Sequence, residues 1–229
     1  MRLDKFICQS TNLTRTLAKR EIARGNVKIA GEVVRKSDYK VTEDMDVFLS
    51  GTSLSQRPPR YIMLHKPIDT VCSTVDEEHQ SVISLIEADK RNELHIAGRL
   101  DVDTTGLVLI TDDGQWSHRV TSPKRDCSKR YRVQLAEPIA ETAIADFNAG
   151  IQLRSEDKPC LPAKLEILSP QEVLLTIQEG KYHQVKRMFA SQGNCVVGLH
   201  REQIGEIELD PALELGEWRY LTAEEAASI

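Results

Sequence analysis

The residue types best suited to chemistry gather in one ten-residue stretch of the chain. It reads Gly98-Arg99-Leu100-Asp101-Val102-Asp103-Thr104-Thr105-Gly106-Leu107, with two acids, two hydroxyls and two glycines. An apolar run at residues 107–110 follows at once. A buried strand does not need carboxylates where it begins, so we interpret at least one of the two acids as kept for a reaction or for binding.

The acids fit three kinds of site, of which the first would bind calcium. An EF-hand loop would place its calcium ligands and central glycine at Asp101, Asp103, Gly106 and Asp112. Thr105, however, stands where that loop usually has Asp or Asn, and the apolar run replaces the polar half of the loop. These departures argue against a calcium loop.

The second kind of site would transfer phosphate. Residues 101–105 match the DxDxT sequence of haloacid-dehalogenase-type phosphatases, in which the first Asp becomes an aspartyl-phosphate. Those enzymes need a buried apolar strand leading into the motif. Here the segment that leads into the motif contains Gly98 and Arg99, and the chain lacks the regular alternation of strands and helices of that fold. Both observations argue against a phosphatase.

Bulk composition limits what can surround such a site. The 229 residues suffice for one large or two modest domains. No apolar run approaches the roughly 20 residues of a membrane helix, and the first residues lack the apolar segment of a secretory signal. The five cysteines contain no CxxC pair. We therefore expect a reduced, cytoplasmic protein with no membrane segment, disulfide or zinc site.

Charge is divided unevenly along the chain. Residues 1–58 carry 11 Lys and Arg against 7 Asp and Glu, whereas the remainder carries 19 against 28. This asymmetry predicts a small basic module attached to an acidic body, and the basic face could also be merely solvated.

The basic module has the pattern of two helices followed by a hairpin. Apolar residues from Leu3 recur at helical spacing, and a second helix is expected from the N-cap Thr14 to the C-cap Gly25. Strands are expected around 27–29 and 33–34, with another at 47–49. Paired prolines mark a linker at about residues 53–60.

This module resembles the S4 RNA-binding domain. The segments that carry the resemblance are Arg2–Ile7, Thr14–Ala18, Ile22–Val27 and Ile29–Val34. The family usually has Asn where this chain has Ala30. The resemblance implies a domain at residues 1–58 that binds RNA. The clustered cations Arg15, Lys19 and Arg20 are expected to contact phosphates there.

The acidic body alternates short strands with a few helices. Strands are predicted at 61–66, 71–74, 107–111, 129–135, 163–168 and 172–177, helices at 81–87, from Pro138 to Phe147 and at 182–191, and a turn at 112–114. The pattern favours an α+β fold with a mixed, mainly antiparallel sheet.

Several segments of this body support a third kind of site. They are Lys66-Pro67 with Val71-Cys72-Ser73, Arg99-Leu100-Asp101 with Thr105-Gly106, Lys129-Arg130-Tyr131, and Glu179–Met188. In this order they resemble the motifs of the pseudouridine synthases, in particular the RsuA branch, which carries an S4 domain in front. The resemblance covers residues 1 to about 225 and implies a catalytic domain at residues 61–229.

The resemblance implies isomerisation of uridine to pseudouridine in 16S rRNA, at uridine 516, on free RNA or on a small-subunit assembly intermediate. A synthase for large-subunit rRNA and a non-catalytic RNA-binding assembly factor remain alternatives. The reaction needs no metal and no cofactor. No hydrophobic seam indicates an oligomer, so we expect a monomer.

The resemblance also assigns roles to three residues. Asp101 is the nucleophile, Lys186 forms the ion pair that keeps this carboxylate ionised, and Tyr131 stacks on the uracil, with a hydroxyl placed to help remove the C5 proton. The alternatives are a solvated helix charge for Lys186 and an ordinary sheet residue for Tyr131. Asp103 is interpreted as a turn residue.

Further cations of the body are expected to contact RNA. They are Arg99, Lys66, Lys181, His183 and Arg187. Arg201 is a weaker candidate for a phosphate contact.

Overall fold

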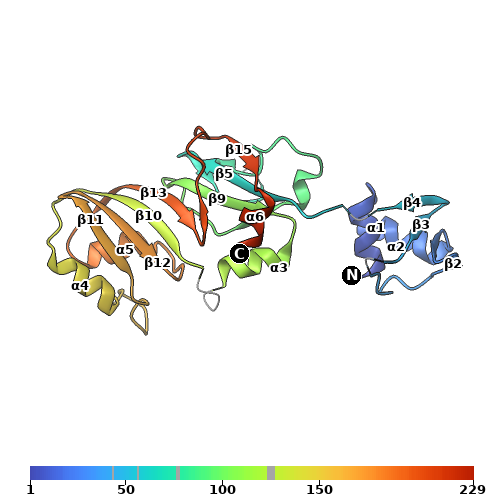
Figure 1. Ribbon diagram of the computed structural model, residues 1–229, viewed down its shortest axis with the longest axis horizontal. Helices are drawn as coiled ribbons and strands as arrows, with labels where there is room; N and C mark the ends of the chain where they lie inside the picture. Colours follow the sequence, from blue (N-terminus) through green and yellow to red (C-terminus); the bar gives the residue numbers. More distant parts are fainter. Residues whose placement is uncertain (43, 56, 76–77, 123–126) are drawn as a thin grey trace. The chain divides into compact units, whose positions relative to one another are not determined.

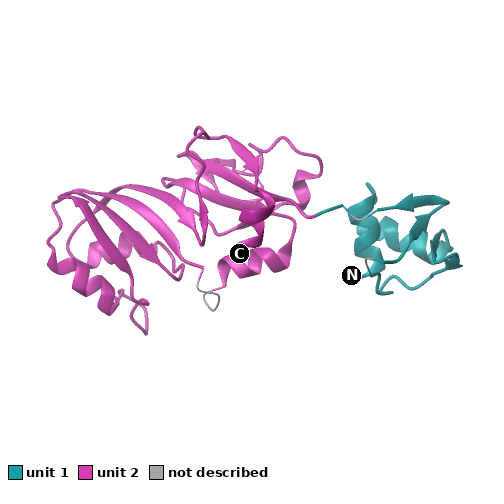
Figure 2. Ribbon diagram, in the orientation of Figure 1, with its two compact units in different colours: residues 1–58 teal, residues 59–229 magenta. Residues whose placement is uncertain are grey.

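In the computed structural model the chain forms two compact units, Met1–Pro58 and Pro59–Ile229 (Figure 2). The structure describes all residues except 43, 56, 76–77 and 123–126. Each unit has its own hydrophobic core, and each is described below by itself.

The smaller unit packs two helices against a four-stranded antiparallel sheet of order β2-β1-β3-β4 (Figure 1). Its elements are α1 (Leu3–Ser10), α2 (Arg15–Arg24), β1 (Val27–Ile29), β2 (Glu32–Val33), β3 (Val47–Leu49) and β4 (Thr52–Leu54). Thr14 caps α2 by accepting a hydrogen bond from the Leu17 amide, and Gly25 ends the helix in the left-handed conformation, as the sequence predicts.

The turn between β1 and β2 explains the preference for Asn at residue 30. Ala30 has a φ of 50° and Gly31 a φ of 84°, so both residues adopt the left-handed conformation of a type I′ hairpin turn. An alanine tolerates this region less well than Asn, at a cost of roughly 1 kcal/mol. The chain forms the turn although it has Ala30 where the S4 family usually has Asn.

The larger unit is built on a nine-stranded sheet. Its main path has the order β11-β12-β10-β13-β9-β5-β15, with β14 paired to β13 and β8 to β9. The strands are β5 (Tyr61–Lys66), β8 (His95–Ala97), β9 (Thr105–Thr111), β10 (Lys129–Leu135), β11 (Lys164–Ser169), β12 (Glu172–Ile177), β13 (Val196–Ile204), β14 (Ile207–Glu208) and β15 (Trp218–Tyr220). Within this sheet only the pair β9–β13 is parallel in the described part of the chain.

Helices and short elements complete the larger unit (Figure 1). They are β6 (Thr70–Val71), β7 (Gln80–Ser81), the 3₁₀ turn Arg91–Glu93, α3 (Gly114–Thr121), α4 (Thr142–Ala149), α5 (Gln184–Ser191) and α6 (Ala223–Ala227). No helix among the described residues is long and apolar enough to cross a membrane.

Two cores on opposite faces of the sheet explain the uninterrupted apolar run of β9. Val108 and Ile110 belong to the core that α4 and α5 cover, whereas Leu107 and Leu109 belong to the core that contains Trp116 of α3. A strand buried on both faces needs apolar side chains at every position rather than at alternate ones. The run that follows the acidic stretch is therefore a central strand.

Several predicted elements differ from those observed. The predicted helix at 81–87 is wrong, because Ser81 pairs in β7 and its hydroxyl accepts a hydrogen bond from the Ile83 amide within a turn. The strand predicted at 71–74 is shorter, since β6 ends at Val71. The turn predicted at 112–114 begins α3 instead, because the Asp113 carboxylate accepts hydrogen bonds from two amides of the first helical turn.

Three predicted boundaries also shift. Helix α4 begins at Thr142 rather than at Pro138, because the Ile139 amide donates to the Pro170 carbonyl and holds the preceding segment to the β11–β12 turn. Helix α5 begins at Gln184 rather than at residue 182. Strand β4 covers the first residues of the predicted linker at 53–60, so those residues do not link the units, and residue 56 lies outside the described residues.

Candidate active site

The acidic stretch forms the connection between β8 and β9, two antiparallel strands. Gly98 has a φ of 95°, which lets the chain leave β8 sharply, and the Thr104 amide donates to the Asp101 carbonyl in a turn at 3.1 Å. We call residues 98–104 the acidic loop. Two buried cations hold it from inside the protein.

The first of these cations is Arg201, on β13. Its side chain is only 2% exposed. The guanidinium donates to the carbonyls of Gly98 at 2.8 Å, Leu107 at 2.8 Å and Arg99 at 3.4 Å, and to the Tyr131 hydroxyl at 3.4 Å. Arg201 therefore connects the start of the acidic loop and strand β9 to β10 and β13. Its expected role in phosphate binding is wrong, because the side chain is buried and its guanidinium donates to four oxygens of the protein.

The second cation is Lys66, at the end of β5. It is fully buried, and its ammonium donates to the carbonyls of Pro67, Val102 and Thr104 at 3.0, 3.3 and 2.9 Å. Burial lowers the pKa of Lys66. The ammonium is not available to an RNA phosphate, contrary to the prediction from sequence, and it positions the acidic loop instead.

Strand β13 approaches β9 so closely that only glycine fits at residue 106. Gly106 pairs with Arg201 in the parallel register and has a φ of 111°. A Cβ at this position would lie 2.3 Å from the Arg201 carbonyl oxygen and 2.5 Å from its nitrogen. This close approach brings the Arg201 side chain beneath the acidic loop.

The loop presents its two carboxylates to a lysine on α5. Lys186 Nζ lies 3.2 Å from Asp101 Oδ2 and 2.6 Å from Asp103 Oδ1. On the other side of Asp101, His183 Nε2 lies 3.5 Å from Oδ1. The side chain of Asp101 is 33% exposed and that of Asp103 is 65% exposed, so solvent reaches both.

The lysine and the second acid affect each other's pKa. Burial alone would lower the pKa of Lys186, but the hydrogen bonds to Asp103 and Asp101 outweigh it and raise the pKa. The hydrogen bond from Lys186 lowers the pKa of Asp103. Lys186 thus carries its charge at neutral pH. The contact between Asp103 and Lys186 was not anticipated, because the sequence shows only a short acid in a turn.

A cavity of about 920 Å³ lies against these groups, a volume within the usual range of ligand sites. Its wall includes Asp101, Asp103, Lys186 and His183, together with Arg99, Tyr131, Lys129, Lys181, Tyr182 and Arg201. A smaller recess of about 100 Å³ shares Asp101 and Tyr131 with it and extends toward Leu199. The carboxylate of Asp101 is therefore accessible to a bound molecule.

Tyr131 and Arg99 complete the wall in different ways. Tyr131, on β10, is 8% exposed, and its ring lies with its centroid 5.9 Å from the Arg201 guanidinium carbon. Arg99 is exposed, and its side chain has no hydrogen-bond or ion-pair partner among the described residues. The structure thus brings Asp101, Lys186 and Tyr131 to one cavity, with a free cation beside them.

The remaining predicted RNA contacts of the larger unit differ in availability. Lys181 lies 3.6 Å from Glu156, and Arg187 lies 3.0 Å from the same carboxylate. Arg187 also donates to the carbonyls of Arg154 and Tyr182. These two cations are already partnered by Glu156, whereas Arg99 borders the cavity without a partner among the described residues and His183 borders it beside Asp101.

In the smaller unit the three predicted RNA contacts are all exposed. Arg15 lies 3.2 Å from the buried carboxylate of Asp4, which Arg2 also contacts. Hydrogen bonds from Arg2 and Arg15 lower the pKa of Asp4 to about 2. Lys19 and Arg20 form no ion pair in the described part of the chain and remain open to a polyanion.

Among the described residues, no group of three or more His, Cys, Asp or Glu side chains is arranged to hold a metal ion, at this cavity or elsewhere. Cys72 is buried near the loop and accepts a hydrogen bond from the Leu100 amide at 3.2 Å. Burial raises the pKa of the Cys72 thiol, which is consistent with a packing role.

Comparison with known proteins identifies the class. Residues 60–191 match the RNA pseudouridylate synthase family, and residues 1–47 match the S4 domain. The chain belongs to the RNA pseudouridylate synthases and carries an N-terminal S4 domain. The α+β fold with a mainly antiparallel sheet and the S4 resemblance are thereby confirmed.

Its similarity to particular proteins extends over the full length. It is 55% identical to the ribosomal small subunit pseudouridine synthase A of Vibrio cholerae serotype O1, with 100% of this chain and 99% of the relative covered. It is 52% identical to the enzyme of the same name from Escherichia coli K12, with both chains fully covered. A solved structure titled as a pseudouridylate synthase superposes with a TM-score of 0.73 at 48% identity, covering 100% of this chain and 99% of that one.

Replacing Lys66 tests whether this residue positions the acidic loop or contacts RNA. Lys66→Met removes the ammonium that donates to the Pro67 carbonyl and to the Val102 and Thr104 carbonyls of the acidic loop. We expect kcat to fall by roughly 10- to 100-fold because the acidic loop loses its position. The affinity for RNA and its salt dependence should stay unchanged. Turnover and the slope of log Kd against log salt concentration are the measurements.

Arg99→Gln is the matched control, because this cation is exposed at the cavity. It should reduce the salt slope by about 0.7, the contribution of one phosphate contact on single-stranded RNA. An equal reduction in Lys66→Met would show that the Lys66 ammonium reaches RNA after all.

Proposed function

We propose that this enzyme converts a uridine of small-subunit ribosomal RNA to pseudouridine with Asp101 as the nucleophile. The observation that carries the proposal is the Asp101 carboxylate, which borders the cavity and has the Lys186 ammonium 3.2 Å away. The names of the two relatives support the small subunit as the source of the RNA. The sequence resemblance points to uridine 516 of 16S rRNA.

The reaction needs one positioned carboxylate rather than an external energy source. The bond between uracil N1 and the ribose breaks, the base turns, and a bond forms from the ribose to C5. A proton leaves C5 and one is gained at N1, so atoms balance without an oxidant or a cofactor. Asp101 fits this requirement because two cations hold its loop while its own oxygens remain accessible.

Lys186 keeps Asp101 reactive once RNA covers the site. A carboxylate that loses water without a partner tends to take up a proton. The Lys186 ammonium stays beside the carboxylate during that desolvation, and Asp103 holds the ammonium from its other side. A lysine supplies a point charge, so the orientation of Asp101 comes from the backbone of the acidic loop.

Tyr131 supplies a surface for the displaced uracil. Its ring borders both the main cavity and the recess, and stacking of a base on an aromatic side chain contributes about 1–3 kcal/mol. Its hydroxyl accepts a hydrogen bond from the Arg201 guanidinium at 3.4 Å and would help to remove the C5 proton. Arg99 and His183 would contact the RNA at the rim of the same cavity.

The S4 domain would supply affinity through phosphate contacts of Arg15, Lys19 and Arg20. We place the domain boundary between residue 58 and residue 61. We further propose that the protein acts in the cytoplasm as a monomer, without a metal or cofactor, on free 16S rRNA or on an assembling small subunit.

Replacing the nucleophile tests the proposal directly. Asp101→Asn removes the reactive charge and keeps the shape of the loop, so pseudouridine formation should fall below detection while RNA affinity stays within about threefold. Release of tritium from 5-tritiated uridine in small-subunit rRNA measures the reaction.

Asp103→Asn is the control, because it also removes a carboxylate that contacts Lys186. It should retain turnover within about tenfold of the wild type. Turnover of Asp101→Asn near that of the wild type would exclude Asp101 as the nucleophile.

Neutralising the S4 domain tests its role as an RNA anchor. In a variant that replaces Arg15, Lys19 and Arg20 by Gln, we expect weaker RNA binding and a salt slope smaller by about 2, because each lost phosphate contact removes about 0.7. The rate with saturating RNA should stay near that of the wild type. Arg24→Gln, whose side chain is paired with Glu21, should behave as the wild type. An unchanged salt slope in the triple variant would contradict the anchor.

A further inference from the structure

An exposed tyrosine stands at the rim of the cavity without a role in the reaction. Tyr182 is 76% exposed, the highest value among the exposed large apolar and aromatic side chains of the described residues. One face of its ring stacks on His183, with ring centroids 3.8 Å apart and planes inclined by 20°. The stacked pair leaves the rest of the tyrosine ring to solvent.

The backbone around this pair is held in place. His183 adopts a φ of 46°, so the chain turns sharply just before α5. Arg187 donates to the Tyr182 carbonyl at 3.0 Å, and the Gln184 side chain accepts from the Lys181 amide at 2.9 Å. Glu179 in turn accepts from Gln184 at 3.1 Å. These contacts fix the direction in which Tyr182 leaves the loop.

The pair is connected to the reactive carboxylate. His183 Nε2 lies 3.5 Å from Asp101 Oδ1, and Tyr182 and His183 both border the cavity that contains Asp101. The exposed tyrosine is therefore part of the rim that a substrate must pass. An exposed aromatic ring at such a place gains apolar burial when a bound molecule covers it.

We propose that the ring of Tyr182, supported by His183, binds the base of a nucleotide adjacent to the target uridine. The inference rests on the proposed function. A uridine that turns out of its stack leaves its neighbour with an uncovered face, and a flat aromatic ring replaces the missing stacking partner. Tyr182 is thus a positioning residue that holds the RNA while Asp101 reacts.

The surroundings favour a nucleic-acid base over an apolar protein side chain. Arg99 borders the same cavity with no ion-pair partner among the described residues, and Lys181 and Lys186 line it beside the carboxylates that pair with them. Cations beside an exposed aromatic ring match a strand whose bases alternate with phosphates. An apolar protein partner would instead have to cover these charges.

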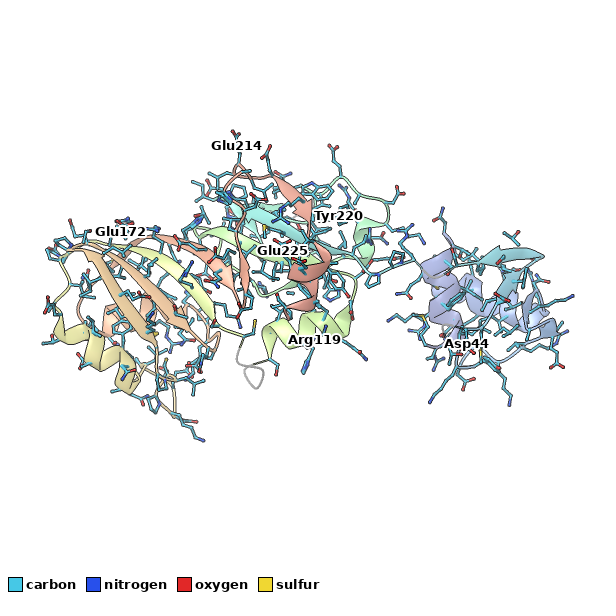
Figure 3. All side chains as sticks on the ribbon, in the orientation of Figure 1. Asp44, Arg119, Glu172, Glu214, Tyr220 and Glu225 are labelled. Atoms are coloured by element: carbon cyan, nitrogen blue, oxygen red, sulfur yellow. The ribbon has the colours of Figure 1, made fainter. Side chains whose placement is uncertain are left out.

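The test compares Tyr182→Ala with Tyr182→Phe in pseudouridine formation on small-subunit rRNA. We expect Tyr182→Ala to raise KM by about 5- to 100-fold, the range for one lost base stack, with kcat within about twofold of the wild type. Tyr182→Phe keeps the ring and should match the wild type. Tyr220→Ala is the matched control, because Tyr220 is 50% exposed on β15, away from α5 (Figure 3).

Binding in the Asp101→Asn background separates this proposal from the proposed function. Oligoribonucleotides that carry the target uridine, with the base of either neighbouring nucleotide removed in turn, serve as probes. One missing base should weaken binding by the same factor as Tyr182→Ala, and the two changes together should weaken it no further. The proposal would be overturned if, for both neighbouring nucleotides, the loss of the base and Tyr182→Ala weakened binding independently, so that their factors multiplied. An unchanged KM in Tyr182→Ala would also overturn it. Absence of turnover in the otherwise unmodified enzyme would instead overturn the proposed function.

Discussion

The approach of β13 to β9 at Gly106 determines the geometry of the site. The two strands form the parallel pair of an otherwise antiparallel sheet, and they lie so close that a Cβ at residue 106 would overlap the backbone of Arg201. From this position the Arg201 guanidinium reaches the Gly98 carbonyl, where the acidic loop begins, and the Leu107 carbonyl in β9, just after the loop. The orientation of Asp101 therefore depends on a side chain a hundred residues further along the chain.

The cations around the active-site cavity have different roles. Lys66, Lys129 and Arg201 are buried, and they donate to backbone carbonyls instead of pairing with acids. Burial lowers the pKa of both lysines in this group. Lys186 alone among the lysines of the cavity wall contacts Asp101. Lys66 and Arg201 hold the backbone of the acidic loop, and Lys129 donates to the Val120 and Cys127 carbonyls outside it. The half-buried Lys186 pairs with Asp101 and lowers the pKa of Asp103.

The sequence predicts the elements and residues whose signals are local. The spacing of apolar residues predicts β5, β10 and α2 almost to the residue and β9 within two residues. The resemblance of residues 129–131 and 179–188 to the family's motifs points to Tyr131 and Lys186. The roles of Lys66 and Arg201 could not be predicted from local sequence. A lone Lys or Arg is normally exposed, and the neighbouring residues do not indicate that these two are buried. The β13 strand was missed because polar residues interrupt its apolar pattern, as His200, Arg201, Glu202 and Gln203 do. Contacts between distant segments bury these side chains, and such contacts leave no periodic signal.

Amide hydrogen exchange in Arg201→Met tests most directly whether Arg201 holds the acidic loop. The substitution keeps most of the side-chain volume and removes the guanidinium that donates to the Gly98 and Leu107 carbonyls. We expect exchange at the amides of residues 98–105 to accelerate by at least about tenfold, which corresponds to 1.4 kcal/mol or more of lost local stability, while β11 and β12 keep their protection. Unchanged exchange across residues 98–105 would contradict this account.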